Sequence, residues 1–221
     1  MALVGRIPWD RKQVQDSIKA IIVRLKLNIP TDNGEAVFTM ALALSAAAKK
    51  VFFEKAGIKF SNEPLLSKSP IIHFKARMRV DVMEKFNNPT VLSVIHYYKN
   101  VKAMEDSTQP PLGVVIIYVE KVYLPELLRL LQYPYVDSED EVSVKDGCGA
   151  LINVVAGHFK KELINLGYPD MEMSAFKSYI NLIEDGVEFP VEQLNKYAVS
   201  FDIDGKKRMV AELVMGGLLR G

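Results

Sequence analysis

The sequence predicts an α+β fold in which long helices pack on an antiparallel six-stranded sheet. Segments with apolar residues at helical spacing alternate with segments rich in β-branched and aromatic residues. The order is helix, strands, helix, strands, which indicates two pseudo-repeated halves that each pair a long helix with antiparallel strands. We expect a helical N-terminal extension over residues 1–31 and a single domain over 32–221, with halves at about 32–111 and 112–221.

Helices are predicted first. Residues 11–27 carry apolar side chains at helical spacing and should form an amphipathic helix. After Pro30, residues 34–56 form a second and more apolar helix, which ends at Gly57 and should be deeply buried. A short helix over 124–131 and a long helix over 143–167 follow later in the chain.

Strands are expected where β-branched and aromatic residues replace helix formers. Asp204 and Gly205 form a strong hairpin signal between the last two strands. The predicted strands cover 71–82, 90–101, 113–120, 171–183, 196–204 and 206–215.

One face of the long helix is nearly free of large side chains. A step of 100° per residue places Val144, Cys148, Leu151, Val155 and Phe159 on the core side. Glycine in a helix interior costs about 0.5–1 kcal/mol relative to alanine, so two glycines on one face need a reason. Either a neighbouring helix of the same domain packs there, or a partner approaches the amide at the centre. The residues of this face are Asp146, Gly149, Asn153, Gly157 and Lys160.

Composition excludes several classes of function. The 221 residues have a formal net charge of +1, so the chain has no electrostatic footprint for nucleic acid or an anionic membrane. The single cysteine, Cys148, excludes a disulfide within the chain and suits a reducing compartment. The N-terminus has no apolar segment typical of a signal peptide, and the apolar run over 36–48 ends at Lys49 and Lys50. We expect a cytoplasmic protein.

Other chemistry has little support in the sequence. His73 and His96 lie on adjacent predicted strands and could face each other, but no carboxylate or thiol pattern completes a metal site. No glycine-rich phosphate loop follows a strand. We therefore expect neither a metal site nor a nucleotide site.

The C-terminal half resembles a known family. The run GALINVVAGHFKKELINLG, with YPYVDSEDEVSVKDG before it and MEMSAFKSYINLIEDG after it, is similar to the second half of the CheX-type chemotaxis phosphatases, the CheC/CheX/FliY family. The preceding PLGVVIIYVEKVYLPELLRLL matches that family's strand and short helix. The resemblance covers about residues 112–215 and implies a CheC/CheX-like fold.

The resemblance implies a mechanism, and this sequence departs from the family pattern at one position of the motif. In the family a helix carrying Glu-x-x-Asn docks against a phosphorylated receiver domain of the CheY type. The Asn orients the water that attacks the aspartyl phosphate, and the Glu pairs with the receiver's lysine. Asn153 matches the Asn, whereas Ala150 stands at the acidic position. Gly149, Ala150, Gly157 and Lys160 would then contact the receiver, which alone would hold Mg²⁺, and this chain would need no cofactor.

Asp146 is the nearest replacement for the missing acid. It returns to the face of Asn153 but lies ~10 Å away along the helix axis. A competing role is helix capping, because Ser143-x-x-Asp146 resembles a capping box. In the first half, Glu35 is followed three positions later by Phe38, so a second phosphatase site is not expected.

Three functions follow from this pattern. We favour a CheX-like domain that binds a phosphorylated receiver and has weak or no phosphatase activity. The alternatives are an active phosphatase in which Asp146 compensates for Ala150, and a non-catalytic structural protein that dimerises. Pairing through an uncapped sheet edge would permit a homodimer in each case.

Overall fold

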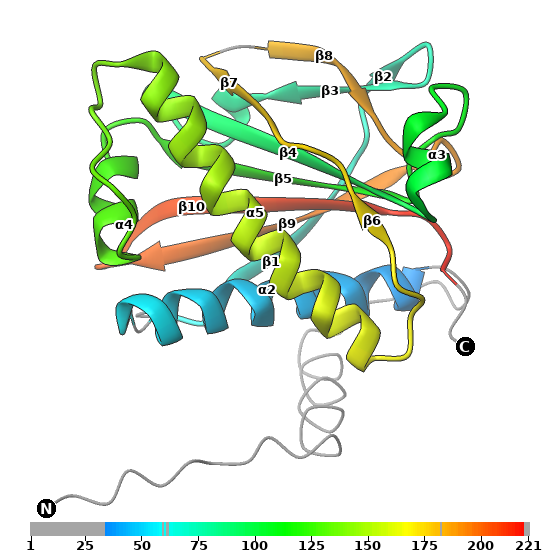
Figure 1. The fold of residues 1–221 in the computed structure, drawn as a ribbon, viewed down its shortest axis with the longest axis horizontal. Coiled ribbons are helices and arrows are strands. Elements are labelled where there is room, and N and C mark those ends of the chain that lie inside the picture. Colours follow the sequence, from blue (N-terminus) through cyan, green and yellow to red (C-terminus); the bar gives the residue numbers. More distant parts are fainter. Residues whose placement is uncertain (1–33, 59, 61, 182, 219–221) are drawn as a thin grey trace, which may run out of the picture.

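The computed structural model describes residues 34–58, 60, 62–181 and 183–218, so the predicted helix over 11–27 and the extension over 1–31 lie outside the described residues. Helices and strands alternate as the sequence indicates (Figure 1). Their bounds are α2 (Gly34–Ala56), β1 (Leu65–Pro70), β2 (His73–Phe74), β3 (Arg77–Asp81), η1 (Val82–Glu84), β4 (Thr90–Tyr98), α3 (Val101–Glu105), β5 (Gly113–Glu120), α4 (Leu124–Leu130), α5 (Glu141–Asn165), β6 (Glu172–Met173), β7 (Lys177–Ile180), β8 (Ile183–Glu188), β9 (Asn195–Ile203) and β10 (Lys206–Met215).

The main sheet is antiparallel and has the order β1-β9-β10-β5-β4-β6, with β7 also paired to β4. The sheet is six strands wide, as predicted. Two short strands, β6 and β7, both pair with β4 and share one edge of the sheet, so it contains seven strands in total. The predicted strand over 171–183 is therefore wrong as one element. Its interruption contains Phe176, whose ring turns toward α5.

A second sheet of three strands, β2-β3-β8, lies apart from the main sheet. The prediction that 71–82 begins the main sheet is wrong, because this segment forms β2, β3 and the start of η1. The edge strand β1 was missed altogether. Its sequence, LLSKSP, contains no β-branched or aromatic residue and ends in proline, so strand propensity gives no signal. Pairing with β9 decides its conformation.

The two halves are related by their pairing pattern. Strands β1 and β7 follow the long helices α2 and α5 and occupy opposite edges of the main sheet, beside β9 and β4. Hairpin β4-β5 of the first half corresponds to hairpin β9-β10 of the second half. Two further pairs of corresponding strands pair with each other across the halves, β3 with β8 and β5 with β10. This correspondence places β5 with the first half, whereas the sequence prediction began the second half with it.

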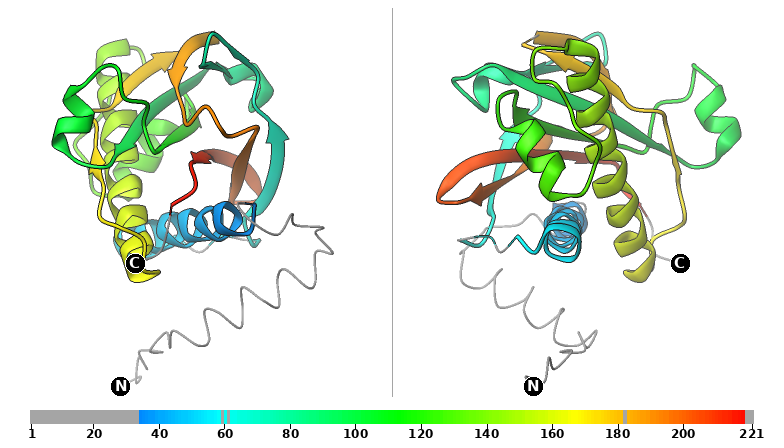
Figure 2. Two further views of the ribbon diagram at one scale, coloured as in Figure 1. Left: turned by 90° about the vertical axis from the view of Figure 1, so that its right-hand side faces the viewer. Right: turned by 60° about the vertical axis from the view of Figure 1, so that its left-hand side comes forward.

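Both long helices cover the same face of the main sheet, and the small sheet covers the other face (Figure 2). One apolar core lies between the helices and the main sheet, and a second lies between the two sheets. Among the described helices, α2 alone has the length and composition to cross a membrane over Ala36–Lys55, and 56% of that window is buried inside the molecule. Its packing against β9, β10 and α5 identifies it as a core helix.

A buried carboxylate forms a network of ion pairs and a hydrogen bond in the second core. Glu212 on β10 is 1% exposed and accepts a hydrogen bond of 2.6 Å from the Tyr118 hydroxyl. The Nζ atoms of Lys85 and Lys196 lie 2.6 and 3.0 Å from its Oε1. Burial by itself raises the pKa of Glu212, but the two lysines and Tyr118 lower it below its ordinary value. The carboxylate is therefore ionised and paired within the protein.

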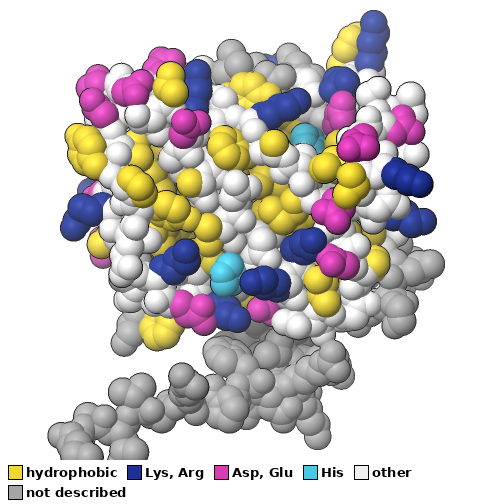
Figure 3. Space-filling view, viewed as in Figure 1, with side chains coloured by type: hydrophobic (Ala, Val, Ile, Leu, Met, Phe, Trp, Pro, Cys, Tyr) yellow, Lys and Arg dark blue, Asp and Glu magenta, His cyan; other side chains and the backbone are white. Residues whose placement is uncertain are grey.

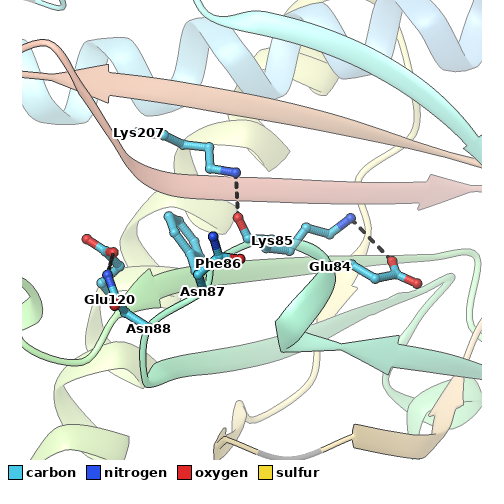
Figure 4. A pocket seen from close by; sticks show the side chains of 7 residues that line it. All are labelled: Glu84, Lys85, Phe86, Asn87, Asn88, Glu120 and Lys207. Carbon is cyan, nitrogen blue, oxygen red and sulfur yellow. Dashed lines mark hydrogen bonds and ion pairs between the residues drawn. The ribbon is translucent and has the colours of Figure 1, made fainter.

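A polar hollow of about 330 Å³ lies beside this network, between η1 and the start of β10 (Figure 4). Lys85 bridges toward Glu84, Lys207 donates to the Lys85 carbonyl, and Asn88 donates to Glu120 at 2.7 Å. The charged groups that line the hollow are thus already paired with one another or with neighbouring residues.

Removing the charge of Glu212 should destabilise the protein strongly. Glu212→Gln leaves Lys85 and Lys196 without their buried counter-ion, and loss of one partner of a buried pair costs about 3–5 kcal/mol. Urea unfolding at pH 7 measures the change in the free energy of unfolding. The matched control is Glu162→Gln, which breaks the 3.7 Å pair with the exposed Lys50 and should cost less than about 1 kcal/mol. Equal effects of the two substitutions would contradict this account.

Candidate functional site

Helix α5 begins earlier than predicted, and Asp140 caps it. The Asp140 carboxylate accepts hydrogen bonds from the backbone N–H groups of Val142 and Ser143 at 3.1 and 3.3 Å. The Ser143 hydroxyl also donates to this carboxylate, which lowers the pKa of Asp140. The predicted capping box of Ser143 and Asp146 is therefore wrong. Asp146 lies in the second turn and is exposed.

The predicted core side of α5 is confirmed. Val144, Cys148, Leu151, Val155 and Phe159 are fully buried against the sheet. Burial raises the pKa of the Cys148 thiol to about 12, so it remains neutral.

Polar contacts from the sheet fix the position of α5. The buried Tyr97 hydroxyl on β4 donates to the Ala156 carbonyl at 2.9 Å. The Ser178 hydroxyl on β7 donates to the Lys145 carbonyl at 2.8 Å. The helix is thus held by two neighbouring strands on its inner side.

The outer side of α5 presents an uncovered amide. We call Asp146, Ala150, Asn153 and Gly157 the α5 strip. Asn153 and Asp146 are exposed, and Ala150 and Gly157 are partly exposed. Within the described part of the chain, the Asn153 side chain makes no hydrogen bond, and a Cβ added at Gly157 would meet no atom within 4 Å. Among the described residues, none covers the strip completely, and all four of its members are at least partly exposed.

Gly149 does not belong to this accessible surface. It is buried, and a Cβ added there would lie 2.1 Å from Cε2 of Phe176. The close approach that this glycine permits is therefore made by the protein's own chain, in the interruption between β6 and β7. The prediction that Gly149 contacts a partner is corrected. Phe176 was missed because no local pattern links it to a helix so far away in the sequence.

Lys160 lies on the same side of α5 but is engaged. Its Nζ lies 2.9 Å from the Asp170 carboxylate, and the hydrogen bond from Lys160 lowers the pKa of Asp170. Exposed pairs of this kind contribute little stability. A partner could replace Asp170 as the counter-ion of Lys160, but in this structure Lys160 is already paired.

Acidic and apolar groups gather where α5 begins. Figure 3 shows acidic side chains over this end of the helix. The exposed acidic residues just before α5 and at its start are Asp137, Glu139, Asp140 and Glu141. Two large apolar side chains are exposed close by in the sequence: Tyr135 is 88% exposed and Val142 is 67% exposed. An exposed apolar surface bordered by charge is typical of a protein interaction site.

The two histidines do not lie on adjacent strands, as the sequence predicted, but in different sheets. His73 lies on β2 of the small sheet, 5.6 Å from the ring of Phe189, and His96 lies on β4 of the main sheet. Burial lowers the pKa of His96 to about 4, against the opposing effect of the Glu188 carboxylate, while Lys177 and Arg77 lower it further. In the part of the chain that the structure describes, no group of three or more His, Cys, Asp or Glu side chains is placed to hold a metal ion.

Solved structures share this architecture. FliY of Thermotoga maritima aligns with a TM-score of 0.52 and 14% identity, over 86% of this chain and 92% of that protein. CheX of Vibrio vulnificus aligns with a TM-score of 0.51 and 16% identity, over 79% and 97%. CheX of Desulfovibrio desulfuricans aligns with a TM-score of 0.50 and 13% identity, over 80% and 99%. The chain has the CheC/CheX/FliY fold. Comparisons with protein-family models and with curated protein sequences give no match.

The two glycines of α5 should respond oppositely to alanine. Gly157→Ala places a methyl group in open space and should raise the free energy of unfolding by about 0.5–1 kcal/mol. Gly149→Ala collides with Phe176, which packs against the main core, and should lower it by about 1–3 kcal/mol. Urea unfolding measures both changes, and Phe176→Ala should relieve the defect in Gly149→Ala. A stabilised Gly149→Ala protein would contradict the packing described here.

Stability should depend on pH through His96. Because its pKa in the folded chain lies near 4 instead of 6.5, the unfolded chain binds more protons between these pH values. The free energy of unfolding should therefore fall as pH decreases from 6.5 toward 4, by on the order of 2–3 kcal/mol from this group. Urea unfolding of His96→Gln at several pH values should show a smaller loss in that window. Parallel pH profiles of the two proteins would refute the assignment.

Proposed function

We propose that this chain binds a phosphorylated receiver domain of the CheY type through the α5 strip and has weak or no phosphatase activity. The observation that carries the proposal is the exposed Asn153 amide at the centre of a strip with small neighbours, in a chain with the CheC/CheX/FliY fold. The proposal places the protein in signal transduction in the cytoplasm, where it acts on a response regulator.

The chemistry of the strip fits binding to a phosphorylated surface. A carboxamide both donates and accepts hydrogen bonds, so Asn153 can hold a water molecule or a phosphoryl oxygen. Ala150 and Gly157 lie about one turn before and after it and leave space for a partner's backbone. The exposed Tyr135, Val142 and acidic residues at the start of α5 add contact area beyond the amide.

The missing acid argues against efficient catalysis. Positioning a water molecule and stabilising developing charge each contribute orders of magnitude to a rate. Asn153 supports the first contribution, whereas the methyl group of Ala150 supplies neither charge nor a hydrogen bond. We therefore expect that docking persists while the acceleration of dephosphorylation is small.

Two alternatives have specific support. Asp146 is exposed and is not the helix cap, which favours an active phosphatase in which Asp146 replaces the missing acid. Its distance of ~10 Å from Asn153 along the helix axis opposes that role. Strand β1 ends the main sheet with one side unpaired among the described strands, which favours a structural protein that forms a homodimer through this edge.

The proposal is tested with receiver domains from the same organism, with and without beryllofluoride as a phosphate analogue. Calorimetry should detect binding only to the beryllofluoride form. Gly157→Trp should weaken that binding at least tenfold, because it fills the open strip, whereas Lys102→Trp on α3 serves as a surface control and should have no effect. If none of the receivers binds in its beryllofluoride form, the proposal fails.

The rate of receiver dephosphorylation separates the three functions. The native chain should accelerate it less than about tenfold, and Ala150→Glu should raise the rate by at least an order of magnitude once the acid is restored. Strong acceleration by the native chain, lost in Asp146→Asn, would favour the active phosphatase. No response to Ala150→Glu, together with absent binding, would favour the structural protein.

A further inference from the structure

We propose that the β2–β3 hairpin inserts into the surface of a lipid membrane that contains anionic headgroups. The hairpin belongs to the small sheet, which covers the face of the main sheet opposite α5 (Figure 2). It is separate from the α5 strip, so the inference does not depend on the proposed function. We call residues 72–77 the hairpin tip.

Every residue of the hairpin tip is exposed. Ile72 is 56% exposed and Phe74 is 72% exposed, so two large apolar side chains lie in water. Figure 3 shows hydrophobic and basic side chains that project beyond the surrounding surface, at the corner where Figure 1 places the β2–β3 turn. Neighbouring apolar side chains exposed in this way indicate an interaction site.

Strand pairing places these apolar residues on one face of the hairpin. Phe74 lies opposite Arg77. The Arg79 N–H donates to the Ile72 carbonyl at 2.8 Å, which places Ile72 opposite Arg79. Alternate residues of a strand share a face, and Met78, between the two arginines, is buried on the other face. The outer face thus carries an apolar row beside a cationic row.

The turn of the hairpin contains residues that fit its backbone poorly. Lys75 and Ala76 have φ values of 47° and 60°. Two-residue turns with positive φ at both positions favour Asn-Gly, because lysine and alanine side chains are strained in this conformation. The chain therefore bears a stability cost to present a lysine in the turn. Strain of this kind is concentrated in functional segments.

The hairpin has positive charge and no acidic residue of its own. Residues 65–80 include Lys68, Lys75, Arg77 and Arg79 and contain neither aspartate nor glutamate. The formal net charge of +1 averages over the whole chain and does not reveal this local excess. The Lys75 ammonium lies 5.4 Å from the centre of the Phe74 ring. A cation and an aromatic ring are therefore presented together.

The two arginines have counter-ions that lipid phosphates can replace. Arg77 lies 3.0 Å from the Glu188 carboxylate, and Arg79 lies 3.9 Å from the Asp81 carboxylate. The Arg77 and Arg79 side chains are 51% and 42% exposed. Exposed ion pairs contribute little stability, and a guanidinium group can donate two parallel hydrogen bonds to a phosphate. Lys75 forms no ion pair with any described residue.

The shape and charge of the tip favour a lipid surface over a protein partner. A protein would need a hollow that matches the projecting Phe74 ring, whereas lipid headgroups move aside for an apolar side chain. Apolar residues then enter the headgroup region, while lysine and arginine side chains reach the phosphates. Face-to-face contact of two copies would bring their cationic rows together, and this repulsion opposes a homodimer through the hairpin.

The test is partition of the full chain onto lipid vesicles, measured by flotation. Vesicles of equal parts phosphatidylglycerol and phosphatidylcholine supply anionic headgroups, and vesicles of phosphatidylcholine alone are the neutral control. The partition coefficient should be about tenfold higher for the anionic vesicles. Phe74→Ser should lower it about tenfold. Phe53→Ser, at a 57% exposed phenylalanine on α2, should leave it unchanged.

The contribution of charge is tested separately. Lys75→Glu should lower the partition coefficient for anionic vesicles about tenfold and leave that for neutral vesicles unchanged. The matched control is Lys206→Glu, at an exposed residue of β10, which should have no effect on either. Receiver binding should be the same in Phe74→Ser as in the native chain, so failure of this inference and failure of the proposed function are distinguishable.

Tryptophan fluorescence locates the inserted residue. Trp9 is the only tryptophan of the chain, so Trp9→Phe combined with Phe74→Trp reports from the tip alone. Anionic vesicles should shift its emission to shorter wavelength, and the same background with Phe53→Trp should not respond. Absence of vesicle binding, or binding that Phe74→Ser and Lys75→Glu leave unchanged, would overturn the proposal. A lipid-free dimer that Phe74→Ser dissociates would overturn it as well, because the tip would then bind a second copy.

Discussion

Strands β5 and β10 pair at the centre of the main sheet, and the rest of the structure is arranged around this contact. Every residue of β5 is buried, because the helices cover one face and the small sheet covers the other. Strands covered on both faces require apolar residues at successive positions, and the run GVVIIYV meets that requirement. The paired strands come from corresponding positions of the two halves, so each half completes the core of the other.

Among the described residues, this arrangement leaves one side of α5 exposed. The sheet, α2, α4 and the segment between β6 and β7 occupy its remaining sides. The sheet binds the helix through Tyr97 and Ser178, and Phe176 fills the space above Gly149. A side chain such as Asn153 is therefore held on a rigid support, which suits recognition of a partner better than a mobile loop does. The corresponding helix α2 offers no such group at Phe38, which is 1% exposed.

The small sheet gives the fold a second interior with different chemistry. On the helix side the core is apolar, apart from the hydrogen bonds that anchor α5. Between the sheets, Glu212 is balanced by Lys85 and Lys196, and His96 is held neutral beside Glu188. Buried charge is tolerated there because each carboxylate has a counter-ion within hydrogen-bonding reach.

The sequence by itself determined the long helices, the central strands, the buried side of α5 and the outward direction of Asn153. These features depend on residue periodicity, which is a local property. Tertiary structure alone decided the conformation of β1, the separate small sheet, the burial of Gly149 under Phe176 and the encounter of His96 with Lys177 and Glu188. Each of these results from contacts between residues far apart in the chain, and their local sequences carry no trace of the partner. Residue propensity and spacing predict each helix or strand separately. Strand pairing and side-chain packing determine which elements become neighbours, and these depend on the whole fold.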